Sequence, residues 1–400
     1  MHTLTDVLFS PLRLERCTLP SRIIRSATYE GMADGEGFPL PALGSLYQSL
    51  VRESPITIIT GFCAISRQGR AMHPRQGAIH ADEYIAAWKT IVDMVKQTNP
   101  DARLIMQIAH AGRQTRTEAT GLQVVGASSR KCTYFRQPVC ALDEKGITNI
   151  ANDFACAAFR AQQAGFDGVQ LHAAHGYLIH QFVSPHTNTR KDKWKSPDLF
   201  LRSCVEALRS RCGPDFPVFL KISHADDRLL QVQRVIEAVR AVAKEVDAVE
   251  VSCGTMEYAM NIFRGACPVD AVLEVNPLFN RTPRFLRWAW KTCVAPSKLR
   301  KFVPFTPLYN LQGALAMQSA LSVPVIPVGG IHNLKDIAAS MQEHGFQAVS
   351  LCRPFICEPD LVEKLRQGRW RQSRCSRCNL CAVYCDSNFS LRCRQEDMKP

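Results

Sequence analysis

Three side chains that can handle protons and oxygen atoms lie close together near the middle of the chain. They are His172, His175 and Tyr177. Residues 168–174 form an apolar run with turn residues on either side, a pattern typical of a short buried parallel strand, and the three side chains lie at or just after its end. Two imidazoles and a phenol at this spacing can hold a carbonyl or phenolate oxygen by hydrogen bonds and deliver a proton. A lone histidine is more often a core or surface residue, but the group of three predicts a catalytic site at the end of this strand.

Apolar, strand-like runs alternate with amphipathic helical runs from residue 22 onward, in eight pairs. The predicted strands span residues 23–28, 57–66, 104–109, 168–174, 218–223, 248–252, 325–329 and 348–352. The predicted helices span residues 40–53, 82–97, 148–164, 198–212, 229–244, 310–321, 334–344 and 360–367. Eight alternating units predict a closed (β/α)8 TIM barrel of the α/β class, with reactive groups at the C-terminal ends of its strands. A doubly wound open sheet is the alternative, but residues 26–31 lack the glycine-rich dinucleotide loop that it usually carries.

Length and composition set looser limits. The 400 residues exceed a usual domain, but a TIM barrel with insertions reaches that size. A net charge of +13 favours anionic ligands or cofactor phosphates. The seventeen cysteines are scattered and the N-terminus is a poor signal peptide, which favours the reducing cytoplasm. No apolar run approaches the ~20 residues that span a bilayer, so we expect no membrane partner.

We assign the barrel to residues 1–368, and two segments are additions to it: an insertion within this range and a tail after it. Residues 255–309 form a long basic connection after the sixth predicted strand, with Phe and Trp interleaved. Such a loop is usually functional or mobile, so we predict a lid or partner-docking cap; a helical excursion with a solvated basic face is the alternative. The basic residues also leave open a nucleic-acid-binding or RNA-modifying protein, although they follow no recognised RNA-binding module. Residues 369–400 form a separate Cys-rich tail.

The residues around the histidines resemble a known signature. They read His172-Ala-Ala-His175-Gly-Tyr177-Leu, then Gln181-Phe-Val-Ser-Pro185, Asn188, Arg190 and Asp192. This phrase resembles the old yellow enzyme family of flavin-dependent oxidoreductases, and the resemblance covers most of the chain. It implies an FMN-dependent enzyme in which NAD(P)H is the reductant and the substrate is an activated alkene or a related small molecule.

The resemblance also implies a flavin site. An isoalloxazine needs a donor at its pyrimidine edge, a positive charge near N1 and contacts to its phosphate. Gln107 matches the donor at the pyrimidine edge, and Lys221 matches the positive charge near N1. Thr28 matches the position that tunes the redox potential of the ring. The simpler alternatives are that Gln107 is a buried structural residue and that Lys221 extends its ammonium group to solvent. The predicted FMN-binding residues are Ser26, Ala27, Thr28, Gly61, Gln107, Lys221, Gly329, Gly330, Cys352 and Arg353. The last four fall at the last two strand ends, where such barrels generally bind phosphate.

Four cysteines near the C-terminus have the spacing C-x2-C-x2-C-x11-C. They are Cys375, Cys378, Cys381 and Cys393, with an additional Cys385. Four thiolates at this spacing suit a soft metal centre, either an iron-sulfur cluster or zinc, and free thiols are the third alternative. The segment resembles the 4Fe-4S segment of the trimethylamine dehydrogenase and 2,4-dienoyl-CoA reductase branch, so a dehydrogenase or C-N cleaving enzyme is an alternative function. A separate electron-donor protein and a homo-oligomer stay open as partners.

Overall fold

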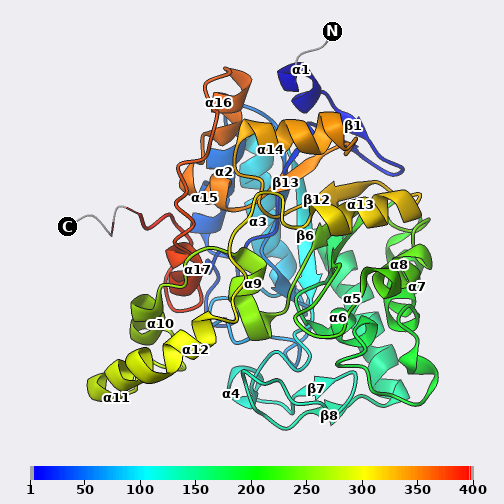
Figure 1. The fold of residues 1–400 in the computed structure, drawn as a ribbon. Coiled ribbons are helices and arrows are strands. Elements are labelled where there is room, and N and C mark those ends of the chain that lie inside the picture. The colour runs from blue at the N-terminus through cyan, green and yellow to red at the C-terminus, as the bar shows by residue number, and fades with distance from the viewer. Residues whose placement is uncertain (1–3, 396, 398–400) are drawn as a thin grey trace.

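Eight parallel strands form a barrel in this computed structural model, which describes residues 4–395 and 397 (Figure 1). The strands are β3 (Ile23–Arg25), β4 (Thr57–Ile59), β6 (Arg103–Ala109), β9 (Gly168–Ala173), β10 (Val218–Ser223), β11 (Ala248–Ser252), β12 (Val325–Pro327) and β13 (Val349–Leu351). Hydrogen bonds connect them in the order β12-β11-β10-β9-β6-β4-β3-β13, and a parallel bridge between Val328 and Ser350 joins the two ends. The predicted barrel is confirmed.

Helices surround the barrel at the predicted places. They are α2 (Pro41–Val51), α3 (Tyr84–Thr98), α5 (Glu144–Gln163), α7 (Leu199–Cys212), α8 (Val232–Arg240), α13 (Leu311–Ala320), α14 (Leu334–Ala338) with its π-helical extension η4 (Ala339–Glu343), and α16 (Leu361–Arg366). Helix α5 buries Ile147, Ile150, Phe154 and Ala158 at helical spacing, which turns one apolar face to the core. It begins earlier than predicted because the Asp143 carboxylate caps it by accepting from the Gly146 N–H at 2.7 Å.

One predicted strand is divided. Residues 57–66 form β4 and a second short strand, β5 (Cys63–Ala64), instead of one continuous strand. The Gly61 N–H between them donates to both carboxylate oxygens of Glu30 at 3.1 Å, so it is not free to bond a neighbouring strand. The prediction of one strand was therefore wrong, because a buried side chain interrupts the ladder.

The connection after β11 and the C-terminal tail lie outside the barrel wall. The connection contains η2 (Met256–Tyr258), α9 (Ala259–Phe263), α10 (Val269–Val275), α11 (Arg284–Ala289), η3 (Trp290–Val294) and α12 (Ala295–Leu299). The tail contributes α17 (Leu380–Cys385), which packs on α10 through Ala271, Leu380 and Val383 (Figure 1). The domain ranges predicted from the sequence, 1–368 for the barrel and 369–400 for the tail, extend beyond the described residues. Residues 1–3 of the first range and residues 396 and 398–400 of the second lie outside them.

Short elements complete the chain. They are α1 (Leu4–Leu8), β1 (Leu12–Arg13), β2 (Thr18–Leu19), α4 (Thr117–Thr120), β7 (Val125–Gly126), β8 (Cys140–Ala141), α6 (Leu178–Val183), η1 (Lys193–Lys195) and α15 (Arg353–Cys357). Within the described part of the chain, each helix is too short or too polar to cross a bilayer.

Candidate active site

The two predicted histidines lie side by side at the end of β9. Their ring centroids are 5.1 Å apart and their planes are nearly perpendicular. His175 adopts a left-handed φ of 61°, and its backbone N–H donates to Ser223 Oγ at 3.0 Å. Its Nε2 lies 2.8 Å from Ser252 Oγ. Two serines therefore fix the orientation of His175; no motif identifies them, but each is the last residue of a predicted strand.

Both imidazoles are neutral at pH 7. The Ala174 N–H points at His172 Nδ1 from 3.4 Å, so hydrogen-bond geometry assigns the ring proton to Nε2. Burial lowers the pKa of His172 well below its ordinary value, and the Lys221 ammonium lowers it further. Burial also lowers the pKa of His175, with His172 and Lys221 adding to the effect. A neutral imidazole can still donate a hydrogen bond to a substrate oxygen.

The Tyr177 phenol completes the group. Its ring centroid lies 4.8 Å from that of His172 and 5.2 Å from that of Phe62. Tyr177 is buried in an apolar cluster that includes Phe62 and Ala109. Burial raises the pKa of its hydroxyl, and Asp386 raises it further, so the phenol keeps its proton until a strong base is beside it. The structure thus brings the three predicted catalytic residues together.

Other polar residues of the signature support the loop that carries the histidines. Gln181 Nε2 donates to the Gly176 carbonyl oxygen at 2.8 Å. Asn188 Nδ2 donates to the Phe182 carbonyl oxygen at 2.8 Å. Arg190 Nη1 donates to the carbonyl oxygen of Ala127 at 2.9 Å. Such buried polar groups satisfy backbone atoms that would otherwise lack partners, so this part of the signature is structural.

A chain of hydrogen bonds crosses the interior of the barrel. Gln107 Nε2 donates to Gln170 Oε1 at 2.7 Å, and Gln170 Nε2 donates to Glu250 Oε2 at 3.1 Å. Lys221 Nζ lies 3.1 Å from Glu250 Oε2 and donates to Ser26 Oγ at 2.9 Å. The chain brings together three predicted flavin residues, Gln107, Lys221 and Ser26. Gln170 and Glu250 were not predicted, although a polar side chain within an apolar strand run is a usable signal.

The ion pair between Lys221 and Glu250, part of this series of hydrogen bonds, determines the charge of the barrel interior. Burial alone would raise the pKa of Glu250, but the Lys221 ammonium lowers it overall. Glu250 is therefore anionic and compensates the positive charge that was predicted to lie near flavin N1. Lys221 remains a hydrogen-bond donor within a nearly neutral pair.

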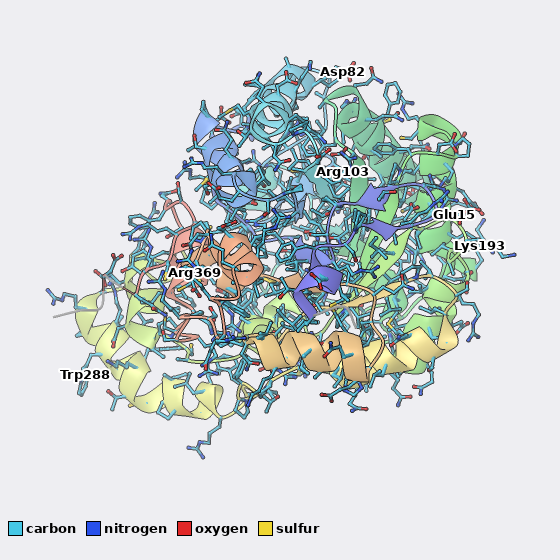
Figure 2. The ribbon with its side chains drawn as sticks, turned by 90° about the horizontal axis from the view of Figure 1, so that it is seen from above. Glu15, Asp82, Arg103, Lys193, Trp288 and Arg369 are labelled. Atoms are coloured by element: carbon cyan, nitrogen blue, oxygen red, sulfur yellow. The ribbon has the colours of Figure 1, made fainter. Side chains whose placement is uncertain are left out.

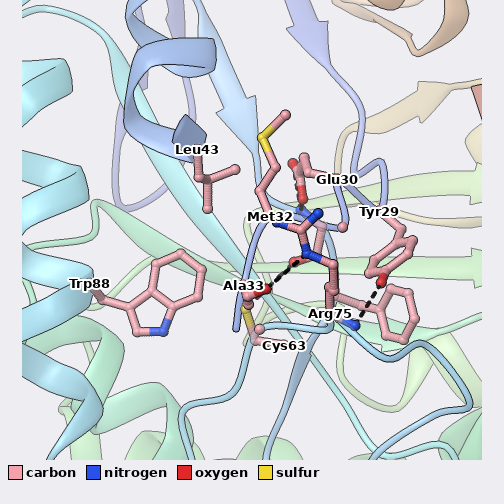
Figure 3. Close-up of a pocket in the computed structure, with 12 residues that line it drawn as sticks. Tyr29, Glu30, Met32, Ala33, Leu43, Cys63, Arg75 and Trp88 are labelled. Carbon is pink, nitrogen blue, oxygen red and sulfur yellow. Dashed lines mark hydrogen bonds between the residues drawn. The ribbon is translucent and has the colours of Figure 1, made fainter. Parts of the chain in front are cut away.

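Thr28, which follows β3, lies next to Cys352, which follows β13. Thr28 Oγ1 lies 3.1 Å from Cys352 Sγ, and Ala27 beside it packs partly buried against the base of the barrel. The Gly61 N–H donates to the Glu30 carboxylate, which also accepts from Arg25 Nη1 at 2.8 Å. Glu30 is thus a buried hub beside the small pocket in Figure 3, which Tyr29, Arg75 and Trp88 help to line.

The predicted glycine pair ends the β12 segment in a sharp turn. Gly329 and Gly330 have φ values of 106° and 80°. A Cβ on Gly330 would lie 2.4 Å from the backbone nitrogen of Leu308, and one on Gly329 would lie 2.6 Å from the Tyr309 ring. Only glycine fits both positions without moving the chain that precedes α13.

Three arginines gather beside this turn. The Arg264 guanidinium lies 4.3 Å from the Tyr309 ring centroid, and those of Arg377 and Arg353 lie 4.5 Å and 5.9 Å from the ring centroid of Phe305. Arg264 comes from the connection and Arg377 from the tail, so neither could be assigned from sequence. Three cations in one place favour an anionic ligand such as a phosphate.

Asn379 of the tail connects these segments. Its Oδ1 accepts from Arg353 Nη1 at 2.9 Å, and its Nδ2 donates to the Ala266 carbonyl oxygen at 2.9 Å. Arg353 Nη1 also donates to the Arg264 carbonyl oxygen at 2.8 Å. The predicted phosphate arginine is therefore held by both the connection and the tail.

The residues present fit FMN. Buried side-chain atoms without a hydrogen-bond partner in the described chain include Glu250 Oε1, Ser350 Oγ, Arg264 Nε, Asn310 Oδ1 and His224 Nε2. Glu250 and Ser350 lie in β11 and β13, His224 follows β10, Arg264 follows α9 and Asn310 directly precedes α13. Buried polar atoms of this kind need a partner, which a water molecule or a bound group can supply. Together with the arginines, they offer donors and acceptors for the carbonyls and phosphate of the flavin. We propose that Gln107, Lys221, Gly329, Gly330 and Arg353 are the residues that would hold FMN.

Five cysteines line one small cavity of the tail: Cys357, Cys375, Cys378, Cys381 and Cys393. Cys357, at the end of α15, lies outside the predicted motif, and its Sγ is 3.8 Å from Cys393 Sγ. The additional Cys385 lies apart from this cavity, since its Sγ donates to the Tyr29 carbonyl oxygen at 3.2 Å. Among the described residues, no three His, Cys, Asp or Glu side chains are placed to hold one metal ion.

The tail also places a carboxyl group near Tyr177. Asp386 follows α17, and its Oδ1 lies 3.4 Å from His73 Nδ1. Burial raises the pKa of Asp386 to about 7 and lowers that of His73 to about 4. The carboxylate form is close enough to Tyr29, Tyr134 and Tyr177 to raise the pKa of each hydroxyl beyond the effect of burial. No sequence motif marks Asp386.

Residues 7–256 and 225–372 match the NADH:flavin oxidoreductase / NADH oxidase family. The chain belongs to this family. The predicted resemblance is thus confirmed, and the barrel is that of a flavin-dependent oxidoreductase that uses NAD(P)H.

Similar proteins have several reductase activities. The 4,4'-dithiodibutanoate disulfide reductase of Rhodococcus erythropolis is 26% identical over 94% of this chain and 92% of its own length. An NADH oxidase of Thermoanaerobacter brockii is 27% identical over 96% of this chain, which spans only 55% of that relative. An NADPH dehydrogenase of Bacillus subtilis is 30% identical over 64% of this chain and 77% of its own length.

Two solved structures share the fold. A 2-naphthoyl-CoA reductase superposes with a TM-score of 0.77 at 20% identity, covering 96% of this chain and 56% of that one. A morphinone reductase superposes with a TM-score of 0.69 at 22% identity, covering 91% and 92% of the two chains. Both likenesses support the barrel.

Proposed function

We propose that this protein reduces an alkene conjugated to a carbonyl group, with NAD(P)H as the reductant. The main support is the grouping of His172, His175 and Tyr177: the His172 ring centroid lies 5.1 Å from that of His175 and 4.8 Å from that of Tyr177. FMN, when bound, supplies the hydride chemistry between NAD(P)H and the substrate.

The two histidines hold the substrate oxygen. Because Ser252 engages His175 Nε2, Nδ1 is the nitrogen that is left for a substrate. His172 offers its Nε2–H, since Nδ1 faces the Ala174 N–H. Hydrogen bonds from these neutral rings strengthen as negative charge develops on the carbonyl oxygen, which lowers the barrier.

Tyr177 delivers the one proton of the reaction, to the α-carbon of the substrate, and is reprotonated from solvent. Burial raises the pKa of its hydroxyl, so the proton stays on the phenol in the resting enzyme. The α-carbon of an enolate is a much stronger base than water, and it can take this proton. General acid catalysis of this kind contributes roughly 10²–10⁴-fold to a rate.

We further propose that the first part of the connection covers the substrate. Glu257 pairs with Arg113 and accepts from Thr133 Oγ1 at 2.7 Å, which ties η2 to the loop after β6. Met256 packs against the apolar cluster of Tyr177. Of the segment 255–309 that was predicted as a lid, we therefore assign this role only to its first helices, η2 and α9.

We also propose that Cys375, Cys378, Cys381 and Cys393 are the ligands of a 4Fe-4S cluster, because all four line one small cavity. Such a cluster would allow a separate donor protein to supply electrons singly. No disulfide bond joins the cysteines of the described chain, and we infer a reducing cytoplasm for the enzyme. Iron and acid-labile sulfide should be present in the purified protein and lost in Cys378→Ser. They should be retained in the control Cys385→Ser, and equal contents in both variants would contradict the ligand assignment.

The decisive experiment for the reaction uses the purified protein. It should be yellow and should release FMN on denaturation. After anaerobic reduction, it should be reoxidised by enones faster than by enoyl-CoA thioesters, amines or an alkyl disulfide. A colourless protein that cannot be reconstituted with FMN would contradict the proposal, as would reoxidation by every acceptor class except enones.

A further inference from the structure

The outer part of the connection after β11 is a helical run that stands away from the barrel. Elements α11, η3 and α12 follow one another without a break over residues 284–299, which we call the outer helix. Figure 1 shows it projecting beyond α10, and Figure 2 places Trp288 at the edge of the molecule. Lys291 Nζ pairs with Asp270 of α10 at 2.6 Å, and the Trp290 ring centroid lies 6.2 Å from that of Phe279. One side of the outer helix is thus anchored and the other faces solvent.

Large apolar side chains on this helix face water. Phe285 and Trp288 are each 69% exposed, Leu286 is 46% exposed and Leu299 is 36% exposed. With Val303, they make up five of the nine exposed large hydrophobic side chains in the described part of the chain. Scattered apolar side chains on a surface are ordinary, but a concentration within nineteen residues marks an interaction site.

The same segment is strongly basic. No Asp or Glu occurs between Glu274 and Asp336. The cations are Arg281, Arg284, Arg287, Lys291, Lys298, Arg300 and Lys301. Lys291 is paired with Asp270, and Arg287 Nε donates to the Thr282 carbonyl oxygen at 2.6 Å, whereas Arg284 and Lys298 are exposed. Exposed cations therefore accompany the exposed apolar side chains of the outer helix.

We propose that the outer helix attaches the enzyme to an anionic lipid surface. A helix with this pattern lies in the plane of a membrane interface, where apolar side chains enter the headgroup region and cations meet lipid phosphates. Tryptophan is favoured at that depth. This surface attachment revises the expectation of no membrane partner, which considered only segments that span a bilayer.

The lipid surface accounts for both halves of the pattern. A nucleic acid would use the cations but would leave Leu286 and Leu299 in water. A protein partner would need a preformed pocket for each apolar anchor, whereas a lipid interface accepts apolar and basic side chains along the whole helix. The exposed side chains project from a convex helix, a shape that suits insertion into a deformable interface.

Co-sedimentation of the full-length flavoprotein with vesicles tests the proposal. Binding should be strong with equal parts of phosphatidylglycerol and phosphatidylcholine, weak with phosphatidylcholine alone, and reduced by salt. Removal of one cation, as in Arg284→Gln or Lys298→Gln, should weaken binding about fivefold, and the two together more. Lys145→Gln removes an exposed cation from α5 and serves as the matched control.

The apolar contribution has its own test. Trp288→Ser should weaken vesicle binding at least tenfold, as expected for loss of a buried aromatic side chain, whereas Leu229→Ser, at a site that is 62% exposed elsewhere, should not. Trp88, Trp194 and Trp370 are buried, so a blue shift of the protein emission on vesicle binding reports on the outer helix. Trp288→Phe should keep binding and lose most of that shift.

Steady-state oxidation of NAD(P)H in solution should be unchanged in all of these variants, because the outer helix projects away from the barrel (Figure 1). Binding that is equal for both vesicle types, or that Trp288→Ser and Arg284→Gln leave intact, would overturn the proposal. Binding to single-stranded RNA without binding to vesicles would overturn it in favour of a nucleic acid.

Discussion

The Ser252 hydroxyl lies 2.8 Å from His175 Nε2, so a residue at the end of β11 orients an imidazole that follows β9. His175 needs this support because its backbone occupies the left-handed region, which is uncommon for a residue with a side chain. The hydroxyl also determines which ring nitrogen is free. Ser252 is therefore a positioning residue, and it need not contact the substrate.

Ser252→Ala should loosen His175 without disturbing the barrel. A hydrogen bond of this kind contributes about 1 kcal/mol, so we expect phenol and enone binding to weaken roughly fivefold. The measurement is a titration followed by flavin difference absorbance. Ser319→Ala, on the exposed side of α13, is the matched control, and FMN content should be unchanged in both. Equal phenol affinities for the two variants would show that Ser252 does not position the histidine.

Tyr177→Phe should separate proton delivery from binding. The ring remains in its apolar cluster, so stability and phenol affinity should change little. Turnover of enones that need an α-proton should fall by roughly 10² or more. Stopped-flow reoxidation gives the rate, and reduction by NAD(P)H should be nearly unaffected. His172→Ala and His175→Ala should instead weaken binding; an unchanged oxidative rate in Tyr177→Phe would move the proton donor elsewhere.

Gly330→Ala should release FMN. A methyl group there would meet the Leu308 backbone nitrogen at 2.4 Å, so the turn beside the arginines must move. Gly121→Ala is the control, because Gly121 has a similar φ of 67° but no atom within 4 Å of the place where a Cβ would lie. Both variants bear the cost of a left-handed alanine, about 1–2 kcal/mol. Flavin content per protein should fall only in Gly330→Ala, and equal contents would argue against this turn as the phosphate site.

Glu30→Gln should destabilise the barrel. Glu30 bonds Arg25 at 2.8 Å and Tyr47 at 2.7 Å, and all three side chains are buried. Removal of one charge leaves the Arg25 guanidinium buried and unpaired, which costs about 3–5 kcal/mol. Urea unfolding measures the loss. Glu206→Gln breaks an exposed pair with Arg202 and should change stability by less than about 1 kcal/mol; similar effects would mean that the hub is solvated.

Asp386→Asn should change how stability depends on pH. Partial burial, with 33% of the side chain still exposed, raises the pKa of Asp386 from 3.8 to about 7 in the folded protein. The folded state therefore binds a proton that the unfolded chain has released, and stability falls as the pH rises from 3.8 through 7. Asparagine cannot ionise, so the variant should lose less stability over this range. Melting temperatures between these pH values, with Asp101→Asn as an exposed control, measure the difference; parallel curves would contradict the raised pKa.

The barrel could be predicted because the strand runs are predominantly apolar and most of the helices bury one apolar face. The histidine group and Gln107 could be found because they lie within or directly after strands. Arg264, Arg377 and Asp386 could not, since tertiary contacts bring the connection and the tail to the barrel, among them the packing of α10 on α17 and the hydrogen bonds of Asn379. Cys357 was missed for a related reason: it completes the cysteine cavity from the barrel side, eighteen residues before Cys375.

Asn379 has a consequence for how the holoenzyme is assembled. One amide side chain is shared between the arginine expected to hold the phosphate and the carbonyl of Ala266 in the connection. A ligand that orders Arg353 therefore also favours the folded tail, and a tail that is well ordered raises the affinity of that ligand by the same factor. Flavin retention and integrity of the cysteine segment should rise and fall together during maturation, so that an incompletely folded tail would yield apoprotein.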